Sequence, residues 1–235
     1  MIYVTSDLHG CSPEDFQRLL NQAGFRDEDF LFVLGDVIDR GQYGAELLLW
    51  LTQQSNMQLI LGNHEAFLLS STFVFLPVED EGVENLSLEE IQMAANWISN
   101  GAGPTLEGLQ RLMKADPESV EGIVDYLRES PLYEEVEAAG QKFLLVHAGL
   151  ANFRPDRSLE DYAPEELLWD RPGLDTSYYP DRRVIFGHTP TLFYGEEYAG
   201  RPIHTKTWSC IDVGVAGGYA PMLLRLDDGK EFYLE

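Results

Sequence analysis

The stretch FLFVLGDVIDRG, residues 30–41, joins a continuous apolar run to a turn that holds two aspartates. An apolar run of this length is typical of a strand that is buried on both faces of a sheet. A helical pattern follows in GAELLLWLTQ at 44–53, and a second strand pattern follows in MQLILG at 57–62. The two strands and the helix between them predict a βαβ unit.

The residues before this stretch repeat the same arrangement. MIYVTSDLHG at 1–10 opens with a strand pattern, and apolar residues at helical spacing follow between Ser12 and Gly24. Ser12 is suited to cap the start of this helix, and Gly24 is suited to end it. Strand and helix therefore alternate along the start of the chain, which predicts right-handed connections and a largely parallel sheet.

The rest of the chain changes character twice. Residues 66–130 carry helical patterns at 96–113 and 117–129 beside the acidic stretch 78–90, and we interpret this region as a helical insertion or cap. Strand patterns then return, and they lie at 132–138, 141–148, 183–188, 208–214, 222–227 and 230–235. The parallel first half and the antiparallel-looking second half predict an α/β fold with two facing mixed sheets flanked by helices. We expect a single domain over residues 1–235.

The composition is that of a folded globular protein with a large excess of acid. Sixteen Lys and Arg against 40 Asp and Glu give a formal charge of −24, which repels DNA and RNA backbones. No Lys or Arg cluster offsets this charge, so we expect no nucleic-acid partner. The near-apolar run at 67–76 is too short to span a bilayer, and no basic leader precedes the first strand. With only two cysteines, we expect a cytoplasmic protein that does not bind membranes.

Residue types that bind metals and phosphates gather where the predicted strands end. Three motifs of this kind are Asp7-x-His9, Gly35-Asp36-Val37-Ile38-Asp39-Arg40-Gly41 and Gly62-Asn63-His64-Glu65. Two more histidines, His147 and His188, end later strands. Ligands of α/β sheets bind just beyond the carboxyl ends of the strands. We therefore expect these residues to meet in one site.

The residue types point to a pair of divalent cations. Carboxylate oxygens mixed with neutral imidazoles suit borderline ions, so we expect manganese, with zinc or iron as alternatives. A carboxylate can bridge two ions, and Asp36 is the natural candidate because Gly35 lets the backbone approach closely. Two such cations with two ligand carboxylates and a hydroxide keep a charge of roughly +1. This local charge would attract a phosphate in an otherwise acidic protein.

The ordered set D-x-H, G-D-x-x-D-R-G, G-N-H-E, H-A-G and G-H-T-P resembles the motifs of the calcineurin-like metallophosphoesterases. Within that superfamily, the chain looks like the short bacterial and bacteriophage form of the phosphoprotein phosphatases. The resemblance implies that one metal ion is held by Asp7, His9 and Asp36. It implies that a second metal ion is held by Asp36, Asn63, His147 and His188.

The resemblance also implies a mechanism. A hydroxide that bridges the two metals attacks phosphorus in line. His64 protonates the leaving oxygen, and Asp39 orients His64 and favours its protonated form. Arg40 binds phosphate oxygens with its guanidinium group. Arg171, in the more loosely matching segment LLWDRPG, is the candidate for a second phosphate clamp.

The chain departs from the eukaryotic protein phosphatases at two places. Leu61 stands where they have an arginine before G-N-H-E, and no equivalent of their S-A-P-N-Y segment is found. The stretch NWISNGAGPT at 96–105 also resembles a segment of the compact microbial enzymes. No role follows from its residues alone.

These features predict a phosphomonoesterase that acts on phosphoserine and phosphothreonine in proteins, with phosphotyrosine as an extension, or on a small phosphoester. The alternative is symmetrical hydrolysis of diadenosine tetraphosphate, because a similar site serves that chemistry. Tyr178, Tyr179 and Trp208 are available to stack on a base in that case, although the loops are acidic. A third hypothesis, a non-catalytic binding module, conflicts with the presence of every ligand position and every residue assigned to catalysis.

Overall fold

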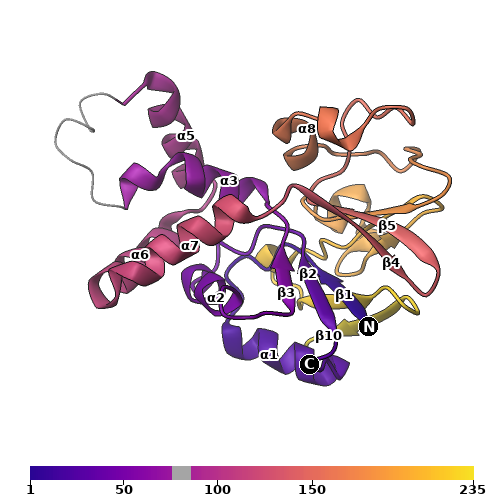
Figure 1. Ribbon diagram of the computed structural model, residues 1–235, viewed down its shortest axis with the longest axis horizontal. Helices are drawn as coiled ribbons and strands as arrows, with labels where there is room; N and C mark the ends of the chain where they lie inside the picture. The colour runs from indigo at the N-terminus through magenta and orange to yellow at the C-terminus, as the bar shows by residue number, and fades with distance from the viewer. Residues whose placement is uncertain (76–85) are drawn as a thin grey trace.

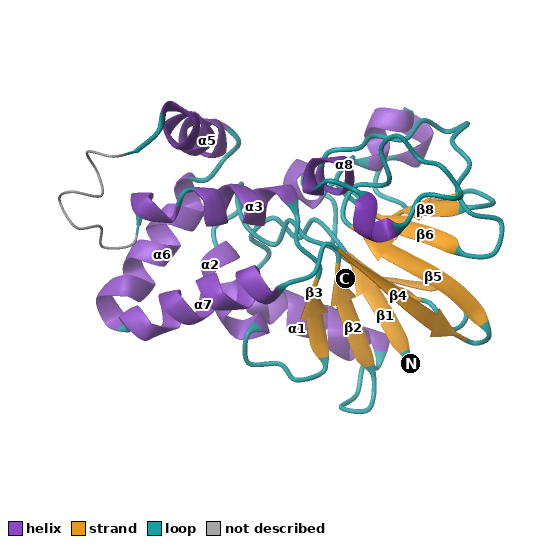
Figure 2. Ribbon diagram, turned by 45° about the horizontal axis from the view of Figure 1, so that its top comes forward, coloured by secondary structure: helices purple, strands orange, loops and turns teal. Residues whose placement is uncertain are grey.

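Two five-stranded mixed sheets face each other in the computed structural model, which describes residues 1–75 and 86–235 (Figures 1 and 2). The first sheet contains, in spatial order, β10 (Lys230–Tyr233), β9 (Met222–Arg225), β1 (Ile2–Thr5), β2 (Phe30–Val33) and β3 (Met57–Leu59). The second contains β4 (Tyr133–Ala138), β5 (Gln141–Val146), β6 (Arg183–Phe186), β8 (Trp208–Cys210) and β7 (Ile203–His204). The predicted fold class is confirmed.

The strand pairing follows the two halves of the chain. β1, β2 and β3 are parallel, as the βαβ pattern predicts, with Ile2 opposite Phe30. β9 and β10 extend this sheet with antiparallel pairs. In the second sheet β5, β6 and β8 are parallel, while β4 and β7 are antiparallel edge strands. Six parallel strands, three in each sheet, thus direct their carboxyl ends to one rim.

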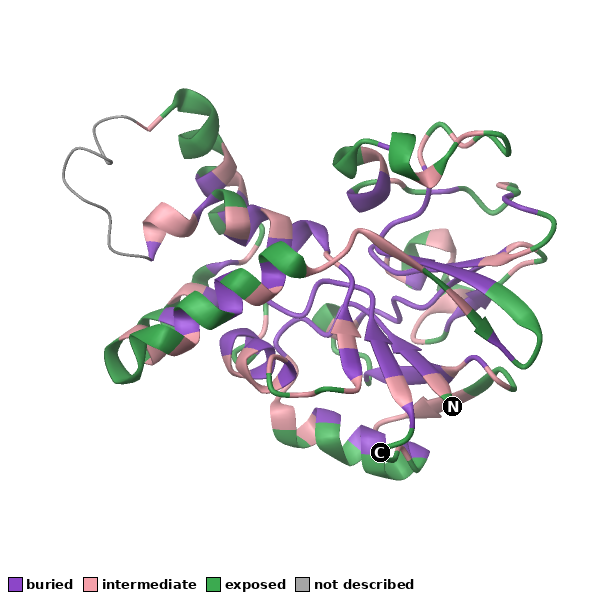
Figure 3. Cartoon of the chain, viewed as in Figure 1, coloured by how far each residue is buried: buried purple, intermediate pink, exposed green. Residues whose placement is uncertain are grey.

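Apolar side chains fill the space between the sheets and the space under the helices. Val4, Phe32 and Leu224 of the first sheet pack with Leu145 and Ile185 of the second. Neighbouring residues on the same strands point the other way, because side chains alternate along a strand. They form a second core with the helices, and Figure 3 shows both sheets as largely buried.

Seven helices accompany the sheets in the described part of the chain. They are α1 (Pro13–Ala23), α2 (Gly44–Leu51), α3 (Asn63–Ser70), α5 (Leu88–Ser99), α6 (Gly103–Ala115), α7 (Pro117–Glu129) and α8 (Pro164–Leu168). The predicted caps of α1 are confirmed: the Ser12 side chain accepts the amide of Asp15 at 3.1 Å, and Gly24 ends the helix at φ 71°. None of the described helices is long and apolar enough to cross a membrane.

The region between β3 and β4 is helical, but one expected helix is in fact two. The pattern at 96–113 predicts a continuous helix, whereas α5 ends at Ser99 and α6 begins at Gly103. Gly101 lies between them at φ 104°, a conformation that a helix cannot contain. α5 also begins earlier than expected, at Leu88, where Ser87 and Glu90 form a capping box. Most of the acidic stretch 78–90 lies outside the described residues.

Candidate metal centre

The strand ends of both sheets deliver the candidate site residues to one rim, on loops rather than on strands. β1 ends at Thr5, so Asp7 and His9 lie on the loop after it, and the alternation of side chains along a strand does not set their directions. The loop backbone does so instead, because six site residues that are not glycine adopt positive φ angles. These are Asp7 at 51°, His9 at 40°, Asp36 at 54°, Asp39 at 69°, Arg40 at 67° and His188 at 64°. Such conformations cost on the order of 1–3 kcal/mol each, and they concentrate at functional sites.

Two groups of potential metal ligands share Asp36. His9, Asp36 and His64 form one group, and Asp36, His147 and His188 form the other. Asp36 Oδ2 lies 3.9 Å from His9 Nε2, while Oδ1 lies 3.5 Å from His147 Nε2. One carboxylate oxygen therefore faces each group, which is the arrangement that a bridging ligand requires.

Asn63 and Asp7 complete the surroundings of these groups. Asn63 Oδ1 lies 2.9 Å from His147 Nε2 and 2.8 Å from His188 Nδ1, so three ligand atoms converge on one point. Asp7 lies outside both groups, and its two oxygens accept the backbone amide of His188 at 3.1 and 2.9 Å. The structure therefore gathers all six predicted ligands at one rim, with Asp7 at the margin.

The backbone orients two imidazoles toward the site. His9 Nδ1 contacts the carbonyl oxygen of Ile38 at 3.0 Å, and His147 Nδ1 contacts that of Leu34 at 2.7 Å. A hydrogen bond of this kind fixes the ring and leaves the other nitrogen free to bind a metal. In both residues the nitrogen left toward Asp36 is Nε2.

Burial and neighbouring groups shift the pKa values of the site residues. It lowers the pKa of His9 to about 4 and that of His188 to about 3, so both imidazoles are neutral at pH 7, as ligands must be. Burial also raises the pKa of Asp7, and the nearby Asp212 and Asp36 raise it further. Burial alone would raise the pKa of Asp36 as well, but the surrounding imidazoles lower it.

These residues fit a pair of divalent cations. The donor set mixes neutral imidazoles, an amide oxygen and carboxylates, which suits borderline divalent ions. Asp7, Asp36 and Asp212 are each at most 2% exposed, so three carboxylates crowd a space with little solvent to screen them. Bound cations would relieve that repulsion.

His64 and Asp39 form a buried pair next to the ligands. His64 Nδ1 lies 2.5 Å from Asp39 Oδ2. Although burial alone would lower the pKa of His64, the carboxylates of Asp36 and Asp39 raise it overall. Trp97 Nε1 donates to Asp39 Oδ2 at 2.7 Å, and Thr105 Oγ1 donates to Asp39 Oδ1 at 2.7 Å. Every oxygen of this carboxylate thus has a partner.

The stretch 96–105 therefore has a structural role that sequence analysis did not find. Trp97 lies on α5 and Thr105 on α6, and the carbonyl oxygen of Gly101 between them accepts the amide of Arg40 at 2.9 Å. The only sequence signal was the resemblance of this stretch to a segment of the compact microbial enzymes. The side-chain hydrogen bonds to Asp39 explain the presence of Trp97 and Thr105 at these positions.

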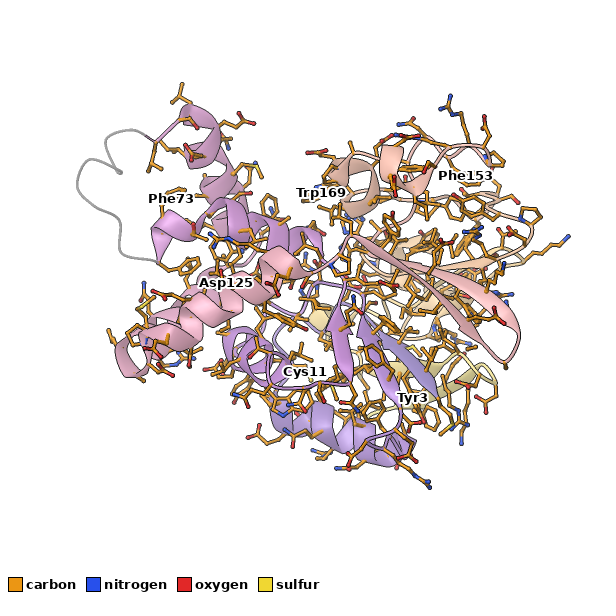
Figure 4. All side chains as sticks on the ribbon, in the orientation of Figure 1. Tyr3, Cys11, Phe73, Asp125, Phe153 and Trp169 are labelled. Carbon is orange, nitrogen blue, oxygen red and sulfur yellow. The ribbon has the colours of Figure 1, made fainter. Side chains whose placement is uncertain are left out.

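The two predicted arginines differ in position. Arg40 Nη1 lies 2.9 Å from His9 Nε2 and Nη2 lies 3.1 Å from His64 Nε2, so the guanidinium group lies directly on the candidate site. Arg171 is exposed, and it is near enough to His188 to lower the pKa of that imidazole. Trp169 lies beside it at the end of α8, with its ring 5.3 Å from Phe67 and 5.7 Å from His188 (Figure 4).

Glu65 holds the loop that carries Asp36. Its carboxylate is fully buried and accepts the amides of Asp36 at 2.8 Å, Val37 at 2.9 Å and Gly62 at 3.2 Å. Gly35 and Gly62 of these two loops pack closely, because a Cβ at Gly35 would lie 2.5 Å from the Cα of Gly62. The sequence places Glu65 in a motif, but its anchoring role depends on a loop almost 30 residues away.

The whole-chain comparison agrees with this geometry. A sequence profile described as calcineurin-like phosphoesterase matches residues 1–216. The chain belongs to the calcineurin-like phosphoesterase family. The predicted superfamily and the predicted hydrolysis of phosphoester bonds are confirmed, and divalent metal ions are the cofactors of this family.

Individual proteins similar to this calcineurin-like phosphoesterase include hydrolases of nucleotides. A symmetrical bis(5'-nucleosyl)-tetraphosphatase of Paracidovorax citrulli is 28% identical over 165 residues, which cover 69% of this chain and 49% of the relative. One from Erwinia tasmaniensis is 30% identical over 150 residues, covering 63% of this chain and 44% of the relative. The chain thus spans about half the length of the curated relatives it matches.

Solved structures show the same fold at low identity. One, of a protein proposed to be a diadenosine tetraphosphatase, has a TM-score of 0.62 and 17% identity, and the match covers 99% of this chain and 91% of that chain. At this identity the likeness establishes the fold and no substrate.

Three aromatic residues that were available in the sequence to stack on a base do not line the candidate site of this calcineurin-like phosphoesterase. Tyr178, Tyr179 and Trp208 are 5%, 7% and 0% exposed. They pack in the core on the second sheet with Phe186 and Val184. Trp208 lies within β8, and Tyr178 and Tyr179 lie in the loop before β6, where their rings are buried against the sheet.

Proposed function

We propose that this calcineurin-like phosphoesterase hydrolyses dinucleoside tetraphosphates symmetrically, with diadenosine tetraphosphate as substrate and two molecules of ADP as products. The observation that supports phosphate hydrolysis is the position of Asp36, with one oxygen toward His9 and the other toward His147. The substrate is proposed from the similarity to symmetrical bis(5'-nucleosyl)-tetraphosphatases over the part of the chain that carries these motifs. We therefore place symmetrical hydrolysis of diadenosine tetraphosphate, the alternative in the sequence analysis, above protein dephosphorylation, which the motifs predict first.

The proposed ligands are those that the resemblance implies: Asp7, His9, Asp36, Asn63, His147 and His188. Divalent cations held there would neutralise charge on the phosphate and activate a water molecule. We propose manganese as the ion, with zinc or iron as alternatives.

The side chains beside the ligands have distinct proposed roles. His64 holds a proton for the leaving phosphate oxygen, and its raised pKa keeps a larger protonated fraction near neutral pH. Asp39 orients the ring through the 2.5 Å contact to Nδ1, which leaves Nε2 to face the site. Arg40 offers paired donors to phosphate oxygens, and Arg171 offers a second guanidinium group at the exposed side.

Hydrolysis of phosphoserine or phosphothreonine in proteins is the second candidate. One observation favours it: among the described residues, Arg40 and Arg171 are the two cationic side chains that we place at the site. Two arginines suit a single phosphate, whereas a tetraphosphate brings several negative charges into a chain of formal charge −24.

Initial rates on the two substrates test the proposal. Manganese-loaded protein is given diadenosine tetraphosphate or a phosphoserine and phosphothreonine peptide at equal concentration, and the nucleotides are separated by chromatography. Release of ADP alone, faster than peptide dephosphorylation, is the expected result. Faster release of phosphate from the peptide would overturn it, and formation of AMP with ATP would contradict symmetrical cleavage.

A further inference from the structure

A cavity of about 230 Å³ adjoins the candidate metal centre. Its inner wall includes Arg40 and His9, which also belong to the metal centre. Its outer wall comes from two loops: Leu192 and Phe193 follow β6, and Tyr219 precedes β9. The lining of the outer wall is apolar apart from the tyrosine hydroxyl and the backbone.

The outer wall leaves aromatic surface in water. Phe193 is 71% exposed, and Leu192 and Tyr219 are 39% and 37% exposed. A single exposed apolar residue needs no explanation, but three around one cavity beside a phosphate-binding arginine form a local apolar patch. The patch contains none of the residues assigned to metal binding or proton transfer.

The glycines around Tyr219 hold its ring in place. A Cβ at Gly200 would lie 2.5 Å from Cδ1 of Tyr219, and a Cβ at Gly214 would lie 3.2 Å from Cδ2. Both glycines have positive φ, at 72° and 88°. The ring therefore fits between two positions where a larger residue would displace it, which makes this wall of the cavity pre-formed.

We propose that this cavity, named here the Phe193 cavity, binds the aromatic base of a nucleoside phosphate whose phosphate lies at Arg40. The proposal rests on the proposed function and specifies how the substrate is selected. Size and chemistry both support a base: the volume is below that of sites for drug-sized ligands, and aromatic side chains bind bases by stacking without reading their edges. A short alkyl phosphate such as phosphoserine would leave the cavity to water.

Binding of ADP and of inorganic pyrophosphate tests the cavity separately from catalysis. Both carry a diphosphate, and only ADP carries a base. Dissociation constants are measured by calorimetry on manganese-loaded protein for the wild type, Phe193→Ala and Phe193→Trp. Leu88→Ala is the matched control, because Leu88 is 87% exposed on α5 and does not line the cavity.

We expect the preference for ADP over pyrophosphate to fall about 5-fold or more in Phe193→Ala. Phe193→Trp keeps a flat ring and should retain the preference, as should Leu88→Ala. An unchanged preference in Phe193→Ala would overturn the cavity proposal even if diadenosine tetraphosphate is cleaved. A wild type that does not cleave this nucleotide, yet loses ADP preference on Phe193→Ala, would overturn the proposed function and support the cavity.

Discussion

The indole nitrogen of Trp97 donates a 2.7 Å hydrogen bond to Asp39 Oδ2, the same oxygen that lies 2.5 Å from His64 Nδ1. Trp97 belongs to the helical region between β3 and β4, whereas Asp39 and His64 follow strands of the first sheet. The helical region thus reaches the candidate proton donor through one fully buried carboxylate. A change in this region can therefore affect both stability and the orientation of His64.

Replacing Trp97 with Phe should lower the free energy of unfolding by about 1–3 kcal/mol, because Asp39 loses a buried donor. Urea unfolding measures this change. Trp50→Phe is the control, since Trp50 packs edge-on against Phe16 at a ring distance of 6.0 Å and is not among the hydrogen-bond partners described for Asp39. An equal loss in both variants would show that the indole volume, and not its hydrogen bond, matters.

Replacing His64 with Ala separates two roles. The structure groups His64 with His9 and Asp36 as potential ligands, whereas the resemblance assigns it to proton transfer. If it is the acid, the variant keeps its metal content and loses turnover by about 10²–10⁴-fold on substrates with poor leaving groups. Metal analysis after gel filtration and rates on a series of aryl phosphates measure both effects. Equal losses for good and poor leaving groups would refute the acid role.

Replacing Asp36 with Asn should reduce the content of both metal ions, because Asp36 faces both ligand groups. The amide keeps the size of the side chain and removes its charge. Metal content per protein is measured after dialysis against a weak chelator. His204→Gln is the control, as His204 contacts Ser209 and Glu231 outside the site. Loss of a single ion would argue against a bridging role.

Replacing Gly187 with Ala should destabilise the protein by about 1–3 kcal/mol and weaken metal binding. A Cβ at this position would lie 2.0 Å from Asp7 Oδ2 and 2.5 Å from Ser6 Oγ, so Asp7 must move. Gly122→Ala in α7 is the control, because its Cβ would meet no atom within 4 Å and should stabilise the helix by about 0.5–1 kcal/mol. Thermal unfolding and metal content distinguish the two variants. A tolerated Gly187→Ala with full metal content would contradict the close approach seen here.

Local patterns alone predicted most of the elements and the place of the site. Apolar spacing predicted the parallel start through β3, and Ser12 and Gly24 marked both ends of α1. The motifs predicted that Asp7, Asp36 and His188 would gather beyond strand ends. These features are determined by residues within a few positions of each other, because capping and amphipathic spacing act over one or two turns of chain.

Only the tertiary structure decided which distant groups touch. Thr105 reaches Asp39 across 66 residues, and Tyr178 is buried although its sequence context allowed an exposed position. The break at Gly101 and the left-handed backbone at Asp7 depend on neighbours packed from other elements. Local spacing predicts which residues face one side of an element, but the partner on that side is selected by long-range packing, and no local pattern encodes it.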